Sequence, residues 1–327
     1  MNYLGKLVAA AILTGFAASA SAYNFSGLYI FGDSLSDSGN IALALGSDSS
    51  QVITGNDYIP NRPYASGQFT DGDVWARTFA SAIGLAPFAE PALAGGGNFA
   101  FGAARTSTDG PKLPPSLLAQ GELFLQSTGG VAPHDALYVL ESGGNDARDA
   151  LAMILSGANA ETVIETAATL YAQSIGVLVD RMQAAGAERI VIWNVPNIGL
   201  SPAIANQGSQ ASLIGERVAL AMNDALSDRI STEKGISIFD DFGLVTSVVM
   251  DPAGAGLINA TDACGAVLAC DPSTYLFWDG LHPTSAGHAL LAQQMIQAIP
   301  EPATYVLLIA GLLVINMQIR RRGSEGD

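Results

Sequence analysis

Short apolar runs alternate with longer amphipathic stretches through most of the chain. The short runs are rich in Val, Ile, Leu and aromatic residues, and most enter turns of Gly, Asn or Pro. They predict buried β-strands at residues 28–31, 136–140, 189–193 and 236–239. The longer stretches repeat apolar residues with helical spacing and predict helices at residues 160–185, 209–234 and 284–298.

This alternation predicts an α/β fold with a central parallel sheet. Strands separated by helices form crossover connections, so helices are expected to cover both faces of the sheet. In such sheets, sites form at the carboxyl ends of the strands. A further short strand is expected at residues 98–103. The polar stretch 46–72 is expected to be a long loop, either functional or a simple insertion.

The amino-terminal end has the pattern of an export signal. A short basic start with Lys6 precedes an almost wholly apolar run at 7–18, and Ala20-Ser21-Ala22 follows. This order is typical of a secretory signal peptide over residues 1–22. The apolar run is too short to favour a retained membrane anchor. The body at residues 23–299 is therefore expected to lie outside the cytoplasm.

The carboxyl-terminal end, residues 300–327, has the pattern of a membrane segment. Pro300-Glu301-Pro302 precedes an apolar run at 303–317, and a basic cluster at 320–322 follows. The run is shorter than a full span, but the basic cluster is a good flank for the cytoplasmic side. We expect this segment to contact the inner membrane, at least transiently.

Composition narrows the possible partners. The chain of 327 residues has 14 basic and 30 acidic residues, and its formal net charge is −16. Nucleic-acid binding rests on clustered Lys and Arg, so this charge excludes nucleic acid as a partner. The 2 cysteines are too few for a four-cysteine zinc site. In an exported protein, Cys264 and Cys270 are expected to form a disulfide, either as a local staple or to hold the approach to residues 279–282.

A candidate nucleophile follows the first predicted strand. The sequence Gly-Asp-Ser-Leu-Ser-Asp-Ser begins at Gly32 and places Ser34 on a strand-to-helix turn. At this position the hydroxyl faces the carboxyl edge of the sheet, where backbone N–H groups can stabilise a developing anion. The same residues are also common in ordinary turns, so this motif alone is a weak signal.

A candidate base stands near the end of the body. Asp279 precedes His282 by three residues, a spacing that lets the carboxylate hold the imidazole in one tautomer while its other nitrogen accepts a serine proton. The other two histidines are expected to be structural, His134 on the surface and His288 in the last helix. The sequence offers no neighbouring histidine or cysteine for a metal at His282, so no metal is expected.

Two further segments fit an oxyanion hole. Residues 98–103 form a short strand ending in Gly102, where a backbone N–H can approach a substrate closely. Residues 143–146, Gly-Gly-Asn-Asp, follow the strand at 136–140 and supply the side-chain amide of Asn145. Each segment alone is compatible with a simple turn, but each follows a separate strand and so reaches the same sheet edge.

These blocks together resemble the GDSL lipase/esterase family of the SGNH hydrolase superfamily, over about residues 27–298. The resemblance implies a flavodoxin-like three-layer sandwich and no cofactor. It implies Ser34 as the nucleophile, with Asp279 and His282 as its partners. It also implies an oxyanion hole made by the N–H groups of Ser34 and Gly102 and the amide of Asn145.

The carboxyl-terminal segment resembles a second known pattern. Pro300-Glu301-Pro302, the apolar run and the arginine cluster are similar to the PEP-CTERM sorting signal of Gram-negative bacteria that make exopolysaccharide. That resemblance implies processing by a membrane protease of the exosortase type. The alternative is a plain single-pass anchor, which places the body on the same side of the membrane.

The resulting hypothesis is a secreted serine esterase or lipase that hydrolyses carboxylic esters through an acyl-enzyme on Ser34. Its ester substrate is a lipid, an acylated sugar or a small ester, and the sequence does not identify the acyl chain. Two alternatives stay open, an acyltransferase with the same residues and a non-catalytic envelope or exopolysaccharide-binding protein. Two competing serine motifs are expected to be structural. Ser201 stands in a near match to G-x-S-x-G that Pro196 and a loop separate from its strand, and Ser231 ends a helix without the partner motifs of S-x-x-K.

Overall fold

The computed structural model describes residues 25–45, 64–65, 67–110, 113–267 and 269–299. The predicted signal peptide at 1–22 and the carboxyl-terminal segment at 300–327 lie outside the described residues. So does most of the predicted loop at 46–72. Phe25–Ile299 forms one compact unit, which contains every predicted strand and helix of the body.

The central sheet has four parallel strands in the order β1-β2-β3-β4. They are β1 Leu28–Phe31, β2 Leu137–Leu140, β3 Ile190–Trp193 and β4 Ile236–Phe239. In register, Phe31 pairs with Leu140 and Trp193 pairs with Phe239, so the carboxyl ends of the strands lie at one edge. All four strand predictions are confirmed to within one residue.

The prediction of a strand at residues 98–103 is wrong. The segment nevertheless lies beside the sheet, next to β1. Asn98 makes only isolated bridges, to Ile30 and to Pro91. Ladder-like bonds still connect the segment to β1, since the Ile30 N–H donates to Gly97 and the Phe99 N–H donates to Ile30. Counting this segment as the second in chain order gives the 2-1-3-4-5 arrangement of flavodoxin-like sheets.

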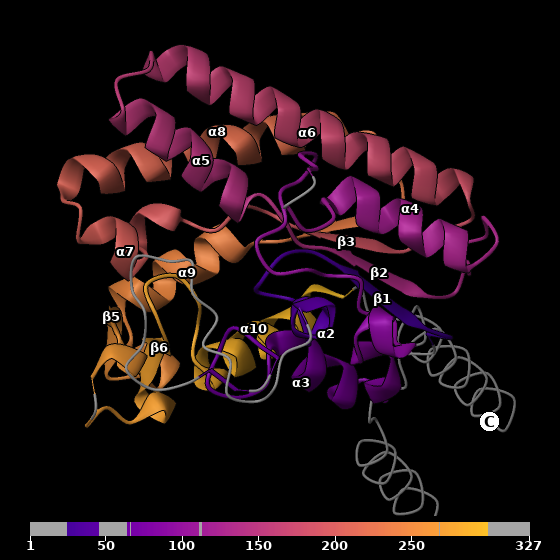
Figure 1. The fold of residues 1–327 in the computed structure, drawn as a ribbon, viewed down its shortest axis with the longest axis horizontal. Coiled ribbons are helices and arrows are strands. Elements are labelled where there is room, and N and C mark those ends of the chain that lie inside the picture. Colours follow the sequence, from indigo (N-terminus) through magenta and orange to yellow (C-terminus); the bar gives the residue numbers. More distant parts are fainter. Residues whose placement is uncertain (1–24, 46–63, 66, 111–112, 268, 300–327) are drawn as a thin grey trace, which may run out of the picture. The chain divides into compact units, whose positions relative to one another are not determined.

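Helices cover both faces of the sheet, so the predicted α/β fold with a central parallel sheet is confirmed. Figure 1 shows α4, α5, α6 and α8 on one side and α3 and α10 on the other. The helices are α2 Asn40–Leu45, α3 Trp75–Ala82, α4 Leu117–Ser127, α5 Gly144–Leu155, α6 Ala160–Ala184, α7 Pro202–Ala205, α8 Ser209–Ile230, α9 Asp241–Met250 and α10 Ser285–Ala298. Short 3-10 turns add η2 Ala86–Ala89, η3 Ala92–Ala94, η4 Ile198–Leu200, η5 Ala253–Ala255, η6 Cys264–Ala266 and η7 Pro272–Thr274.

The predicted helix boundaries agree with the structure except at the end of α8. The apolar pattern predicts that this helix continues to residue 234, but it ends at Ile230. The hydroxyl of Ser231 donates to the carbonyl of Asp228 and competes with the helical bonds there. At the start of α10, the Thr284 hydroxyl accepts the Gly287 N–H at 3.0 Å, so Thr284 is the N-cap.

Helix α6 is the main core element on its side of the sheet. By length and composition it is the one described helix apolar enough to cross a membrane, with a mean hydropathy of 1.3. Just over half of that apolar window, 56%, is buried, and α6 packs against α8 and α5. A core helix of a globular domain has the same properties.

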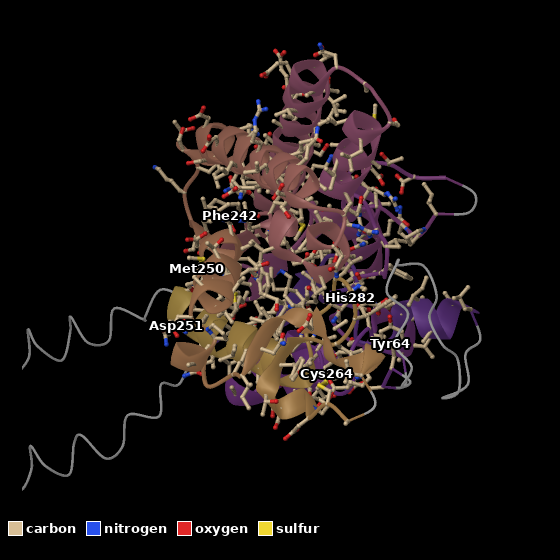
Figure 2. All side chains as sticks on the ribbon, turned by 90° about the vertical axis from the view of Figure 1, so that its left-hand side faces the viewer. Tyr64, Phe242, Met250, Asp251, Cys264 and His282 are labelled. Atoms are coloured by element: carbon tan, nitrogen blue, oxygen red, sulfur yellow. A yellow bond between two sulfur atoms is a disulfide. The ribbon has the colours of Figure 1, made fainter. Side chains whose placement is uncertain are left out.

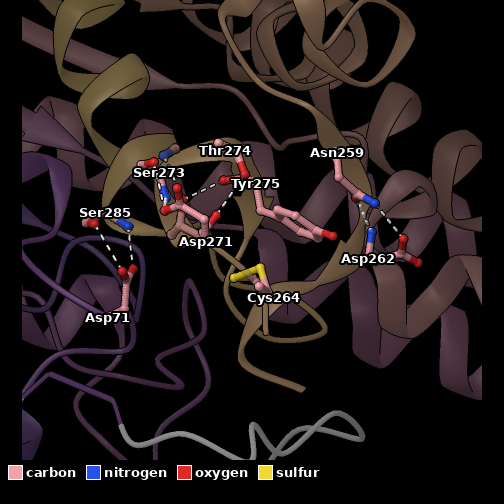
Figure 3. Close-up of a disulfide and its surroundings, with 12 residues drawn as sticks. Asp71, Asn259, Asp262, Cys264, Asp271, Ser273, Thr274, Tyr275 and Ser285 are labelled. Carbon is pink, nitrogen blue, oxygen red and sulfur yellow. Dashed lines mark hydrogen bonds between the residues drawn. A yellow bond between two sulfur atoms is a disulfide. The ribbon is translucent and has the colours of Figure 1, made fainter. Parts of the chain in front are cut away.

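A second, two-stranded sheet lies close to the end of the domain. Strands β5 Asn259–Ala263 and β6 Tyr275–Phe277 are parallel and lead into the segment that carries Asp279 and His282. The disulfide between Cys264 and Cys270 lies in the connection between these strands, as Figure 3 shows. The loop that precedes the candidate base is therefore fixed by both a small sheet and a covalent link.

Candidate active site

Ser34 stands on a tight turn directly after β1. The carboxylate of Asp33 accepts the Leu35 N–H at 3.0 Å, and the Asp33 carbonyl accepts the Asp37 N–H at 2.9 Å. Such an aspartate turn follows from the local Asp-Ser sequence. The turn leaves Ser34 only 8% exposed, and its hydroxyl lies 2.8 Å from Nε2 of His282.

His282 is held by Asp279. Nδ1 of His282 lies 2.7 Å from Oδ2 of Asp279, and Oδ1 of Asp279 accepts the N–H groups of Leu281 and His282 at 2.7 Å each. Because a carboxylate only accepts hydrogen bonds, Nδ1 carries the proton and Nε2 presents its lone pair to Ser34. Burial alone would raise the pKa of Asp279, but the charge and bonds of His282 outweigh it and lower that pKa. The three predicted residues are thus brought together in one continuous contact chain.

Tyr64 is a site residue that the sequence reasoning missed. Its hydroxyl donates to Oδ2 of Asp279 at 2.6 Å, the same oxygen that faces His282. Tyr64 comes from the predicted loop at 46–72. Phe69 from the same stretch packs on His282 with ring centroids 5.2 Å apart. Tyr64 and Phe69 are therefore part of the site, and an isolated tyrosine in a polar sequence gave no signal for this.

The disulfide supports the same corner of the site. Cys264 and Cys270 are joined with their Cα atoms 5.5 Å apart, and both pack in a buried cluster with Tyr64 and Trp278. Figure 2 labels Tyr64, Cys264 and His282 in the same region of the molecule. Trp278 precedes Asp279, so the disulfide lies behind both the tyrosine and the aspartate that orient His282.

The start of α10 is tied to the same region. The Asp71 carboxylate accepts the Ser285 backbone N–H at 2.7 Å and the Ser285 hydroxyl at 3.2 Å, as Figure 3 shows. An acidic group at a helix N-terminus satisfies unpaired N–H groups and complements the helix dipole. These bonds fix the position of the chain just after His282.

Asn145 stands in the first turn of α5, close to Asp33. Its amide donates to Oδ2 of Asp33 at 3.1 Å and to the carbonyl of Ala104 at 2.9 Å. Both amide hydrogens are therefore engaged within the protein. Asn145 lines the same cavity as Ser34, and its amide can donate to a ligand there only by giving up one of these bonds.

Glu141, which the sequence reasoning also missed, lies beneath the nucleophile turn. Its Oε2 accepts the Asp33 N–H at 3.1 Å and the Ser36 hydroxyl at 3.0 Å. A Cβ at position 32 would lie 2.6 Å from the same Oε2, so only glycine at Gly32 allows this approach. Burial raises the pKa of Glu141 well above its ordinary value, and the charge of Asp33 raises it further.

The backbone N–H of Gly102 is not free. It donates to Oδ2 of Asp37 at 2.8 Å, and that carboxylate also accepts N–H groups from the turn around Asn40. The sequence-based prediction that this N–H is an oxyanion donor does not match the observed geometry. The next residue, Ala103, has a positive φ of 64°, lines the cavity, and its N–H has no hydrogen-bond partner among the described residues.

Arg105 lies beside Ala103 and hydrogen-bonds its carbonyl. Its guanidinium forms a two-pronged pair with Asp149, at 2.9 and 3.0 Å, and donates to the Ala103 carbonyl at 2.9 Å. The arginine therefore fixes the peptide that follows Ala103. The N–H of Ser34 likewise has no partner within the described residues, which leaves it free for a ligand.

The competing candidates do not join the hydrogen bonds between Ser34, His282 and Asp279, although Ser201 lines the same cavity. His134 is exposed, and burial lowers the pKa of the fully buried His288 to about 3, so His288 is neutral. The hydroxyl of Ser201 donates to the Ile198 carbonyl, and that of Ser231 donates to Asp228. Within the ranges that the structure describes, no three His, Cys, Asp or Glu side chains gather in a group able to hold a metal ion.

A cavity of about 460 Å³ opens at Ser34 and His282. Its lining is mostly apolar and comes from several elements, including Ile41, Leu45, Ile198, Val245, Phe277 and Leu291. Cavities of this size with a few polar groups are typical of sites for small organic ligands. The cavity therefore suits a ligand with an apolar part, held close to Ser34.

Comparison with known proteins identifies relatives over most of the chain. The chain is 28% identical to Esterase EstA of Pseudomonas aeruginosa over 93% of its own length and 52% of that protein. It is 24% identical to the thermolabile hemolysin of Vibrio parahaemolyticus over 84% of this chain and 64% of the hemolysin. It is also 24% identical to GDSL esterase/lipase At3g50400 of Arabidopsis thaliana, over 82% and 86% of the two chains. The chain spans about half the length of the Pseudomonas esterase.

The family model described as GDSL-like Lipase/Acylhydrolase matches residues 28–295, which run from the first residue of β1 to the last turn of α10. That span contains Ser34, Asn145, Asp279 and His282 together with the whole central sheet. The chain therefore belongs to the GDSL-like lipase/acylhydrolase family of ester hydrolases.

Proposed function

We propose that the protein hydrolyses carboxylic esters through an acyl-enzyme on Ser34. The observation that carries the proposal is the chain of contacts from the Ser34 hydroxyl through His282 to Asp279, each at 2.7–2.8 Å. A serine–histidine–carboxylate arrangement of this geometry activates the serine for acyl transfer in unrelated folds.

In the first step, Oγ of Ser34 attacks the ester carbonyl and its proton passes to Nε2 of His282. The tetrahedral intermediate then collapses, the bond to the alcohol oxygen breaks, and His282 returns the proton to the departing alcohol. In the second step, water attacks the acyl-serine with His282 again as base, and the carboxylic acid leaves. Asp279 stays ionised throughout and stabilises the protonated imidazole.

The oxyanion is stabilised by N–H donors at the mouth of the cavity. The free Ser34 N–H supports a role as one donor, and the Asn145 amide supplies a second when it exchanges its bond to Asp33 for the substrate oxygen. The free N–H of Ala103 is the donor that we assign in place of Gly102. The apolar lining of the cavity then takes the acyl or alcohol chain.

The test is a set of matched serine variants. Ser34→Ala should lose hydrolysis of p-nitrophenyl esters and labelling by a fluorophosphonate, with an unchanged melting temperature. Ser227→Ala, on the exposed face of α8, is the control for the substitution itself. Activity that survives in Ser34→Ala but is lost in Ser201→Ala would overturn the assignment.

We further propose that the chain is exported and that its end contacts the inner membrane. The support is the signal-peptide pattern at 1–22 and the apolar and basic pattern at 300–327. In a Gram-negative host, full-length protein should fractionate with the membrane, and protein truncated after Ile299 should be soluble in the periplasm. If Pro300-Glu301-Pro302 marks processing by an exosortase-type protease, the native host should contain two sizes of the protein. A single long form in that host, with or without changes at 300–302, would leave only an ordinary anchor.

A further inference from the structure

One wall of the catalytic cavity combines two buried polar side chains with apolar neighbours. Asn197 caps η4 and Asp241 begins α9, and both line the cavity that opens at Ser34. They are only 3% and 2% exposed. The lining of the same cavity also includes the apolar residues Ile198, Val245 and Phe277. The polar pair is therefore a local exception on an apolar surface.

Oδ1 of Asn197 is buried and has no hydrogen-bond partner among the described residues. Its amide nitrogen contacts the Thr246 hydroxyl at 3.4 Å. That hydroxyl donates its own proton to the Phe242 carbonyl at 2.7 Å, so it can only accept from Asn197. This fixes the orientation of the amide and leaves Oδ1 as an acceptor without a donor.

Asp241 is the second buried side chain of this cavity lining with an oxygen that lacks a hydrogen-bond partner within the described ranges. Its Oδ1 is also buried without a partner in the part of the chain that the structure describes. Burial raises the pKa of Asp241 to about 8, and the charges of Asp240 and Asp33 raise it further. At neutral pH the carboxyl therefore carries a proton, and it can donate a hydrogen bond as well as accept one. A buried polar group without a hydrogen-bond partner costs about 1–3 kcal/mol of free energy. A ligand that hydrogen-bonds to Asn197 or Asp241 recovers part of this cost.

We propose that Asn197 and Asp241 form a polar subsite that binds a hydroxyl group of the ester substrate. The inference rests on the proposed function, because it concerns a substrate that reacts at Ser34. A hydroxyl both donates and accepts, so it can donate to Oδ1 of Asn197 and accept from the protonated carboxyl of Asp241. A neutral acid beside an amide does not attract a cation, and the apolar neighbours exclude a highly hydrated group.

Two kinds of ester supply such a hydroxyl. It lies on the alcohol in esters of polyols such as glycerol or a sugar, and on the acyl chain in esters of hydroxy acids. Both share the chemistry that the subsite recognises. Simple esters of monohydric alcohols and unsubstituted acids leave both buried groups unpaired, and a site built to bind a hydroxyl discriminates against such analogues.

The experiment compares matched esters on the wild-type enzyme. Glycerol monobutyrate is paired with propyl butyrate, and ethyl 3-hydroxybutyrate with ethyl butyrate. We expect kcat/KM to favour the hydroxylated member of one pair by about tenfold or more, as for one net hydrogen bond. The pair that shows the preference identifies which part of the ester carries the hydroxyl. Equal kcat/KM values in both pairs would overturn the subsite.

Variants then assign the preference to the two residues. Asp241→Leu and Asn197→Leu should bring the ratio of the two kcat/KM values close to one, whereas Asp241→Asn, which keeps a donor, should retain most of the preference. Asp224→Leu on the exposed face of α8 is the matched control. A preference that persists in folded Asp241→Leu and Asn197→Leu proteins would show that another group binds the hydroxyl.

A binding measurement separates failure of the subsite from failure of the proposed function. The ether 1-O-hexylglycerol resembles a glycerol ester but cannot be hydrolysed. Calorimetric titration of Ser34→Ala should show that it binds about tenfold more tightly than its hydroxyl-free counterpart, 1-propoxyhexane. This preference requires no catalysis. An enzyme that binds the glycerol ether selectively but hydrolyses no ester would overturn the proposed function alone, and equal binding of the two ethers would overturn the alcohol-side subsite.

Discussion

The Oε2 atom of Glu141 accepts the backbone N–H of Asp33 at 3.1 Å, and both carboxyl groups are buried beside Ser34. Burial raises the pKa of both carboxyl groups, and the charge of Asp33 raises that of Glu141 further, so we expect Glu141 to retain a proton. Asp33 in turn accepts the amide of Asn145. Asp241, Asp146 and His282 also act on this pair through their charges. The Asn145 amide, which we propose as an oxyanion donor, is therefore positioned by this buried pair of acids.

Glu141→Gln and Glu141→Leu should behave differently for this reason. Glutamine keeps a donor toward Asp33 and an acceptor for Ser36, so kcat near neutral pH should stay within about threefold of wild type. Leucine removes both, and kcat should fall by about 10²-fold, as when an oxyanion donor is lost, with KM little changed. Steady-state kinetics on a p-nitrophenyl ester measure both effects.

Infrared spectroscopy distinguishes a positioning role of Glu141 from a general loss of structure in its variants. The infrared band of a protonated carboxyl at neutral pH should be present in wild type and weaker in Glu141→Gln. Glu165→Leu on the exposed face of α6 serves as the control. Equal losses of kcat in the Gln and Leu variants, or an unchanged carboxyl band, would contradict the role that we assign to the pair.

Tyr64→Phe tests the second hydrogen bond to Asp279. The tyrosine hydroxyl is one of the groups that lower the pKa of Asp279, so its removal should raise that pKa. We expect kcat/KM to fall about tenfold, since hydrogen bonds to charged groups contribute about 1.5–3 kcal/mol. The acid limb of the pH profile should move to higher pH. Tyr275→Phe, whose hydroxyl lies outside the Asp279 hydrogen bonds, should leave the profile unchanged; identical profiles for all three proteins would argue against a role for Tyr64.

The sequence predicted three residues that the structure brings into contact, and it missed those that position them. Ser34, Asp279 and His282 belong to short motifs whose spacing reflects chemistry within a few residues. Tyr64 and Glu141 reach the site from distant segments, so their contacts depend on tertiary packing that no local pattern encodes. The strands were predictable because each is a continuous buried run. The segment at 98–103 was harder because it makes only isolated bridges along β1.

The environment of Gly102 was hard to predict for a related reason. The motif identifies a position where a side chain is excluded, but not which neighbour excludes it. A Cβ at Gly102 would lie 2.3 Å from the ring of Phe69, and that ring packs on His282. Steric exclusion by Phe69 accounts for the glycine without any direct use of its N–H, which is already bonded to Asp37.

Gly102→Ala should therefore act through Phe69. Alanine keeps the backbone N–H, but its Cβ must displace the aromatic ring and with it His282, so kcat should fall by at least about tenfold. The double variant Gly102→Ala/Phe69→Leu removes the clash and should recover part of the lost activity. Measurements of kcat on the wild type, the two single variants and the double variant form a double-mutant cycle, which gives the coupling between positions 102 and 69. Strictly additive losses would show that the two positions are not coupled.

The folding stability should fall as pH rises, because several buried acids bind protons more tightly in the native state. The pKa of Asp37 is raised to about 6 and that of Asp241 to about 8, in each case chiefly by burial. An acid with a raised native pKa contributes stability that is full below its ordinary pKa and is lost as pH rises through the native value. Folding stability should therefore fall between about pH 4, the ordinary pKa of aspartate, and about pH 8, the raised pKa of Asp241.

Thermal unfolding followed by circular dichroism between about pH 5 and pH 9 measures this loss. We expect the melting temperature to fall by at least about 5 °C, since a domain of this size loses roughly 2–4 °C per kcal/mol. Asp241→Asn removes one of the titrating groups and should flatten the upper part of the curve. General charge repulsion in this acidic protein acts in the same direction, and Asp224→Asn controls for it because it removes an equal but exposed charge. If the two variants flatten the curve equally, net charge explains the pH dependence; a larger effect of Asp241→Asn assigns it to the buried carboxyl.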